Sequence, residues 1–194
     1  MGSYLSNHIS NHFSEHIKVI SDTEKEVNAK IDMIMKLILE CLSNDRTLFL
    51  CGNGGSASDS QHIAAELIGR FSSNRNPLRA IALNTDTSVI TCISNDFSYK
   101  EIFSRQLEGL GRRQDVLLAL STSGDSENVN LAIKQANHMG INSIALLGKC
   151  GGEALRLANL SILVPSDSTA RIQETHILIG HIICDLIEKE LDLV

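Results

Sequence analysis

Residues 46–66 read RTLFLCGNGGSASDSQHIAAE, and this order of residue types decides the expected fold. The apolar run that ends in glycine is typical of a strand buried on both faces of a sheet. The segment after the glycine-rich turn predicts a helix over residues 57–71. A strand, a tight turn and a helix in succession form the unit from which parallel α/β sheets are built.

The same unit recurs along the chain. Further strands are predicted at residues 79–84, 115–121, 142–148 and 160–165, and helices at residues 87–96, 99–111, 126–140, 152–158 and 170–191. This alternation predicts an α/β fold with a doubly wound, five-stranded parallel sheet flanked by helices. Because ligands bind beyond the carboxyl ends of such strands, the turns after the strands are where a site is expected.

Two helices are expected before the first strand, over residues 4–20 and 22–44. Ser21 and Glu24, three positions apart, have the pattern of a capping box, which marks the start of the second helix. Residues 1–44 would then be a helical pair within a single domain of residues 1–194. The apolar positions of this pair leave two alternatives, since it could cover the sheet or pack against another subunit.

The composition limits the class of protein. A chain of 194 residues with 43% hydrophobic and 21% charged residues suits one globular domain. The net charge of −6 argues against nucleic acid or an anionic membrane as the partner of the whole surface. No apolar run reaches the about 20 residues that a bilayer requires. Five scattered cysteines without a CxxC pair, and an N-terminus without a signal pattern, predict reduced thiols and a cytoplasmic location.

The turn at residues 52–57 is the first candidate for a ligand site. It matches GxGxxA, a weak form of the dinucleotide-binding fingerprint. That fingerprint also requires an acidic residue about 20 positions later, at the end of the second strand. Here that strand ends in Leu83 and Asn84, and no Lys-Ser/Thr pair follows the glycines. The sequence therefore disfavours a nucleotide site and excludes a Walker A loop.

The turn at residues 121–126, STSGDS, is the second candidate. It places four hydroxyl groups and a glycine between a predicted strand and a predicted helix. The free N–H groups and the positive end of a helix dipole favour an anion at such a turn, and hydroxyl groups can donate to phosphate oxygens. Capping the helix needs one serine, or at most two. Phosphate binding by Ser121, Thr122, Ser123 and Ser126 is therefore the favoured interpretation.

Titratable side chains share faces on two predicted helices. His62 and Glu66 are four positions apart, and Gln173 and His181 are eight apart, about 80° around an ideal helix. If these faces meet, imidazole and carboxylate groups provide suitable zinc ligands, and the amide a poorer one. From the residues alone, the alternative that each is an ordinary surface or hydrogen-bonded residue is the stronger interpretation.

The spacing does not decide which histidine of the last helix takes part. His176 lies one turn after Gln173 and competes with His181. Gly180 is a hint in favour of the His181 region, because glycine inside a helix costs about 1 kcal/mol relative to alanine. Close approach of another element is a reasonable explanation for it.

In order, the segments GNGGSASDSQHIAAE, NTD, SNDF, STSGDS, GGE and RIQETHILIGH resemble the bacterial phosphoheptose isomerases. These form the sedoheptulose 7-phosphate isomerase branch of the sugar isomerase (SIS) domain superfamily. The resemblance runs from the second predicted helix to residue 190. It implies the SIS fold and an aldose–ketose isomerisation through an enediol, from sedoheptulose 7-phosphate to D-glycero-D-manno-heptose 7-phosphate. This reaction is the first step toward the ADP-heptose of lipopolysaccharide core.

The resemblance also implies residue roles. Glu66 matches the catalytic base and His181 the acid. The substrate would be bound by the four hydroxyl residues of the second turn and by Asn53, Gly54, Gly55, Ser56, Glu66, Asn95, Asp96 and Gln173. One zinc ion per subunit would be held by His62, Glu66, Gln173 and His181. The family forms homotetramers whose active sites draw residues from neighbouring subunits.

Two positions depart from the family pattern. Ala170 stands where some relatives have an acidic residue, although Asp167 is nearby. Asp125 stands where many relatives have asparagine, and its charge beside a phosphate is unfavourable unless the side chain turns away or caps the helix.

Two rival functions remain. The segment STARIQE, residues 168–174, is also similar to a non-enzymatic SIS-domain protein that binds the bacterial replication initiator. A sugar-phosphate-sensing SIS domain would need the hydroxyl turn, but neither Glu66 nor His181. The joint presence of Glu66, Ser123 and His181 favours the enzyme.

Overall fold

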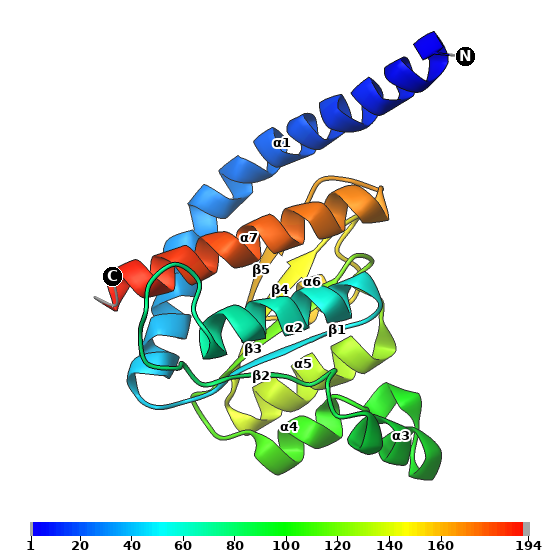
Figure 1. Cartoon of the computed structure of the whole chain (residues 1–194). Coiled ribbons are helices and arrows are strands. Elements are labelled where there is room, and N and C mark those ends of the chain that lie inside the picture. The colour runs from blue at the N-terminus through cyan, green and yellow to red at the C-terminus, as the bar shows by residue number, and fades with distance from the viewer. Residues whose placement is uncertain (1, 192–194) are drawn as a thin grey trace.

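The computed structural model describes residues 2–191, and the side chains from Tyr4 onward. Its centre is a five-stranded parallel sheet in the order β2-β1-β3-β4-β5 (Figure 1). The strands are β1 (Leu48–Gly52), β2 (Ala80–Ala82), β3 (Val116–Ser121), β4 (Asn142–Leu147) and β5 (Leu160–Leu163). The predicted fold class and all five predicted strands are confirmed.

The strand order places a topological switch point between β1 and β3. The chain moves from β1 to β2 on one side and from β3 to β4 on the other. Leu50 pairs with Leu118 and Gly52 with Leu120, so the two strands end side by side. Parallel sheets bind ligands in the crevice at such a point. Both candidate turns therefore lie at the same position of the fold.

Helices cover both faces of the sheet. Side chains alternate between the faces along a strand, so Leu48 and Leu50 enter one core, with α1 (Gly2–Ser43), α2 (Gly55–Ile68) and α7 (Thr169–Glu190). Phe49 and Cys51 enter the other core, with α3 (Thr87–Asp96), α4 (Ser104–Leu110), α5 (Glu127–Met139) and α6 (Ala154–Leu157). Burial on both faces explains why β1 reads as one continuous apolar run.

The prediction of two N-terminal helices is wrong, because α1 is continuous over Gly2–Ser43. No proline or glycine interrupts residues 3–43, so nothing forces the helix to end near Ser21. The Thr23 hydroxyl donates to the carbonyl oxygen of Val19, 2.7 Å away, one turn back within the helix. The capping-box pattern thus lies inside a helix and caps nothing.

The two halves of α1 have different surroundings. In the second half Val27, Ile34 and Ile38 are buried against the sheet and α7. The first half extends beyond the rest of the chain (Figure 1), and its Ile9 and Phe13 are 57% and 67% exposed. Covering the sheet therefore accounts for only the second half of the helix.

The helix predicted over residues 99–111 is also interrupted. A 3₁₀ turn, η1 (Tyr99–Glu101), precedes the separate helix α4. The Ser98 side chain caps the turn by accepting from the backbone N–H of Lys100. Ile102 and Phe103 lie between the two elements and are both buried. The break lets these consecutive side chains enter the core together.

None of the helices that the structure describes is long and apolar enough to cross a membrane.

Candidate active site

Helices α2 and α7 meet closely enough to join side chains from distant parts of the sequence. A Cβ atom added to Gly180 would lie 2.5 Å from Cδ1 of Ile63, so any larger residue would push the helices apart. The close approach predicted at Gly180 is confirmed. Its consequence is that His181, next in sequence, faces the side chains of α2.

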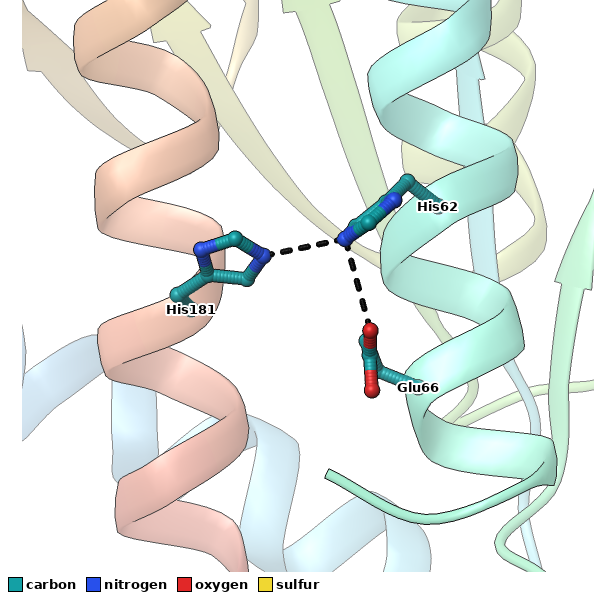
Figure 2. Close-up of side chains that lie close together, drawn as sticks. All are labelled: His62, Glu66 and His181. Atoms are coloured by element: carbon teal, nitrogen blue, oxygen red, sulfur yellow. Dashed lines mark hydrogen bonds and ion pairs between the residues drawn. The ribbon is translucent and has the colours of Figure 1, made fainter. Parts of the chain in front are cut away.

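His62, Glu66 and His181 form a cluster between these helices (Figure 2). The Nε2 atoms of His62 and His181 are 3.0 Å apart, and His62 Nε2 lies 3.3 Å from Oε1 of Glu66. The Glu66 side chain is 25% exposed and that of His62 is 51% exposed. The cluster is thus reachable from solvent in a single chain.

The spacing of this cluster suits a divalent cation. Two donors about 2.0–2.1 Å from a tetrahedral zinc ion lie about 3.3–3.4 Å apart. The separations of 3.0 and 3.3 Å are close to that value, and one ligand atom from each residue falls within 4.8 Å of the others. Two imidazoles and a carboxylate are also the appropriate donor types. The residues therefore fit a metal ion.

His176 is excluded from the cluster. Its side chain is fully buried, and its Nε2 donates to the carbonyl oxygen of Leu147, 3.1 Å away at the end of β4. Burial lowers the pKa of His176 to about 4, so the ring stays neutral. Between the two histidines that the spacing left open, the structure selects His181.

Two further side chains lie beside the cluster. Burial raises the pKa of the Asp59 carboxyl above its usual value, while His62 acts in the opposite direction. On the other side, the ring centroids of Phe71 and His181 are 5.6 Å apart. The sequence interpretation missed both residues, although Asp59 lies only three positions before His62 on α2.

The turn after β1 is held by amide contacts. Asn53 and Asn128 exchange two hydrogen bonds, from Asn53 Nδ2 at 2.8 Å and from Asn128 Nδ2 at 2.9 Å. The Tyr99 hydroxyl also donates to Oδ1 of Asn53, 3.0 Å away. Nothing in the sequence pattern marked Tyr99 or Asn128, because these contacts join segments far apart in the chain. Asn53 is thereby fixed at the start of the crevice.

Gln173 lies at this turn rather than at the cluster. A Cβ atom on Gly55 would be 2.6 Å from both terminal atoms of the Gln173 amide, so only glycine leaves room for it. Eight residues separate Gln173 from His181, about 12 Å along a helix. The chain thus brings together three of the four expected metal ligands, and the metal role of Gln173 stays a prediction.

The turn after β3 is organised by its own hydroxyls. Ser121 Oγ accepts from the N–H of Gly124 at 3.1 Å, and Ser123 Oγ accepts from the N–H of Asp125 at 3.1 Å. The Ser123 oxygen is used as an acceptor, so its hydroxyl proton remains available to an anion, whereas the Ser121 hydroxyl donates to Oγ of Ser126, 3.5 Å away, in a long contact that an anion would have to replace. Ser126 is the N-cap residue of α5 and makes no side-chain capping bond. Capping alone therefore does not explain these hydroxyls.

The Asp125 carboxylate turns away from this turn. Its Oδ1 accepts from the backbone N–H of Glu153 at 2.9 Å, in the segment before α6. A Cβ atom on Gly124 would overlap the carbonyl oxygen of Gly151, so the two turns pack directly on each other. The unfavourable charge expected at Asp125 is thus directed to another part of the chain.

The remaining predicted site residues have fewer contacts. Asn95 Nδ2 donates to Oδ1 of Asp96 at 2.8 Å, and both lie exposed at the end of α3. Ala170 lies exposed in the first turn of α7, and Asp167 is exposed just before it. For Asn95 and Asp96, a role in substrate binding remains a prediction.

Known proteins are similar to this chain in sequence and in fold. The sequence model of the family described as SIS domain matches residues 11–148. The chain is 50% identical over 174 residues to the phosphoheptose isomerase of Sulfurimonas denitrificans, covering 90% of this chain and 89% of that one. It is 51% identical over 162 residues to that of Clostridium acetobutylicum, covering 84% and 83%. The solved phosphoheptose isomerase of Neisseria gonorrhoeae has a TM-score of 0.90 at 42% identity, over 95% of this chain and 99% of that one.

The chain therefore belongs to the SIS domain family, and its parallel sheet flanked by helices matches the fold of the solved relative. Within that family its relatives at about half identity are phosphoheptose isomerases, which makes this chain a sugar-phosphate isomerase. The predicted family and the predicted class of enzyme are confirmed.

Proposed function

We propose that this enzyme converts sedoheptulose 7-phosphate to D-glycero-D-manno-heptose 7-phosphate, the first step toward the ADP-heptose of lipopolysaccharide core. The observation that carries the proposal is the cluster of Glu66 and His181, a carboxylate and an imidazole from two helices that meet beside one another. Moving a proton between adjacent carbons requires a base and an acid at such short range.

In the proposed reaction, Glu66 removes a proton from C1 of the ketose, and the electron pair moves to form the C1–C2 enediol. His181 donates a proton to the oxygen on C2 as this bond forms. Glu66 then returns its proton to C2, and His181 accepts the proton from the oxygen on C1, which becomes the aldehyde. Both side chains end in their starting states, as a catalytic cycle requires.

The phosphate is proposed to bind at the turn after β3. Ser121, Thr122, Ser123 and Ser126 would donate hydroxyl hydrogen bonds, and the start of α5 would favour the negative charge. Asn53, Gly54, Gly55, Ser56 and Gln173 would line the sugar, with Asn95 and Asp96. The diversion of the Asp125 carboxylate toward Glu153 supports this site, because it keeps the charge away from the phosphate.

We further propose one zinc ion per subunit, held by His62, Glu66 and His181. The chain's own Gln173 lies at the turn after β1, so the fourth expected ligand would have to be the Gln173 of a neighbouring subunit. A zinc ion bound there would supply Lewis-acid polarisation of sugar oxygens. Because a zinc-bound carboxylate is a weaker base than a free one, either the contact of Glu66 with the ion would be loose during turnover or the ion would be mainly structural. Elemental analysis of the purified protein tests the ion directly. Absence of zinc, together with full activity in chelator, would remove it from the proposal.

A homotetramer in the cytoplasm is proposed as the working form. The first half of α1 exposes an apolar stripe at four-residue spacing, formed by Leu5, Ile9, Phe13 and Ile17. Contiguous exposed apolar surface of this kind marks a protein interface. The half-exposed His62 also supports completion of the site by a neighbouring subunit. The described cysteines are all free thiols, as a reducing compartment requires.

The substitution Glu66→Gln tests the proposed base, because it keeps the size of the side chain and removes the carboxylate. Turnover of sedoheptulose 7-phosphate should fall by about 10²–10⁴-fold, the usual contribution of a general base. Glu108→Gln, an exposed position on α4, is the matched control and should keep wild-type turnover. Near-normal turnover by Glu66→Gln would refute the assignment. Wild-type protein that does not convert the substrate, but binds the replication initiator tightly, would support the non-enzymatic rival.

A further inference from the structure

We propose that Arg75 and Glu188 are positioning residues that hold Glu66 and His181 in register, an inference that rests on the proposed roles of those two residues. Arg75 lies in the segment between α2 and β2, and Glu188 lies near the end of α7. Their side chains form an ion pair, with Nε of Arg75 2.8 Å from Oε1 of Glu188. Each side chain is only 1% exposed, so the pair lies behind the cluster and cannot touch the sugar.

Arg75 fixes the end of α2. Its Nη2 donates to the backbone carbonyl oxygen of Glu66, and its Nη1 to that of Leu67, both at 2.8 Å. These carbonyls belong to the last turn of the helix and have no partner further along it. The guanidinium group therefore anchors the backbone that carries the proposed base. A planar fork with several donors can do this while also pairing with a carboxylate.

Glu188 fixes the segment that follows α2. Its carboxylate accepts from the backbone N–H groups of Phe71, Ser72 and Ser73 at 3.0, 2.9 and 3.1 Å. These bonds, together with the bond from Arg75, lower the pKa of Glu188 against the effect of its burial. The carboxylate stays charged, which keeps all four donors satisfied. The segment is thus bound to α7 at a single side chain.

The same segment reaches the other half of the cluster. The backbone N–H of Phe71 donates to Glu188. The Phe71 ring packs on the ring of His181, with the centroids 5.6 Å apart. Glu188 itself follows His181 by seven positions, which places both on nearly the same face of α7. One buried pair thus touches the backbone of Glu66 and the ring neighbour of His181.

Two variants separate positioning from folding. Arg75→Lys keeps a positive charge beside Glu188 but loses the fork to the Glu66 carbonyl. Glu188→Gln loses the charge that holds three backbone amides. In both, the kcat for sedoheptulose 7-phosphate should fall about tenfold or more while KM stays within about threefold, because a misplacement of about 1 Å costs up to 10²-fold.

Asp115→Asn is the matched control. Asp115 is also a buried carboxylate that accepts from backbone amides, those of Thr47 at 2.9 Å and Arg112 at 2.6 Å. It lies just before β3, the central strand, and its partners Thr47 and Arg112 belong to the segments before β1 and after α4, neither of which carries a residue of the cluster. Its substitution should lower the melting temperature as Glu188→Gln does and leave kcat near wild type.

The His181 ring gives a readout that does not depend on turnover. Its proton NMR resonance, identified by its loss in His181→Gln, should shift in Arg75→Lys and Glu188→Gln but not in Asp115→Asn, because Phe71 lies against the ring. An unshifted resonance, or kcat values equal to that of Asp115→Asn, would overturn the positioning role. A wild-type protein that does not turn over sedoheptulose 7-phosphate would instead overturn the proposed function.

Discussion

Acidification should destabilise the fold through His176. The unfolded chain protonates this ring near its ordinary pKa of 6.5, whereas burial lowers the pKa in the folded chain to about 4. Nδ1 of the ring has no hydrogen-bond partner, and Nε2 donates to Leu147, so no buried acceptor stabilises a second proton. A folded pKa below the unfolded one gives stability that is complete above the unfolded pKa. It is lost as the pH falls toward the folded pKa.

The linkage relation gives the size of this effect. Between about pH 7.5 and about pH 5, protonation of the unfolded ring should remove about 2 kcal/mol from the free energy of unfolding, at about 1.4 kcal/mol per pKa unit. Urea unfolding at both pH values and one protein concentration measures it in the wild type and in His176→Gln. Glutamine keeps a donor for Leu147 and does not titrate, so the loss on acidification should shrink by that amount.

The control for this experiment is His138→Gln. His138 is exposed near the end of α5, so its ring keeps contact with water in the folded chain. That variant should lose as much stability on acidification as the wild type. An equal loss in the wild type and in His176→Gln would refute the reasoning.

Three further results are expected. Gly124→Ala should lower the free energy of unfolding by about 1 kcal/mol or more, because Gly124 has a positive φ and an added Cβ atom would overlap Gly151. The variant should also raise the KM for the sugar phosphate, and an unchanged melting temperature would contradict the prediction. In a thiol titration, exposed Cys150 should react first and exposed Cys92 more slowly, because the hydrogen bond to Asp96 raises the pKa of Cys92. Faster reaction of any other thiol would contradict the burial of the other three cysteines in the structure. The remaining thiols, each with a pKa raised to about 12 mainly by burial, should react only on unfolding: Cys41, Cys51 and Cys184. Phe13→Glu should lower the oligomeric mass in light scattering while keeping helix content, and an unchanged mass would place the interface elsewhere.

The five strands of the sheet could be predicted from local sequence alone. The runs around Leu50, Leu118 and Ile144 are apolar because both faces of each strand are covered, and this pattern is visible without the fold. The N-terminal helix shows where local signals fail. Ser21 and Glu24 have a capping pattern, but a helix ends only where its backbone loses hydrogen-bond partners. Here the helix continues past both residues, and its side chains from Val27 onward pack into the core.

The site was predictable only in part. The four-residue spacing of His62 and Glu66 already places them on one face of a helix. The spacing from Gln173 to His176 and His181 allowed either histidine, and the packing of Gly180 on Ile63 decided between them. Contacts such as those of Arg75 with Glu188 join residues more than a hundred positions apart, and no local pattern announces them.

The sequence by itself determined the order of the strands and of the helices that follow them, the two strand-end turns and the residue types proposed for proton transfer and phosphate binding. These follow from short-range periodicity and from the chemistry of each side chain. The tertiary structure decided which of those residues meet. It put the turns after β1 and β3 side by side through the strand order, and it brought His181 to His62 and Glu66 through the contact of α7 with α2. The physical reason is that such meetings depend on how helices pack across the sheet, which is set by the whole core rather than by any one segment.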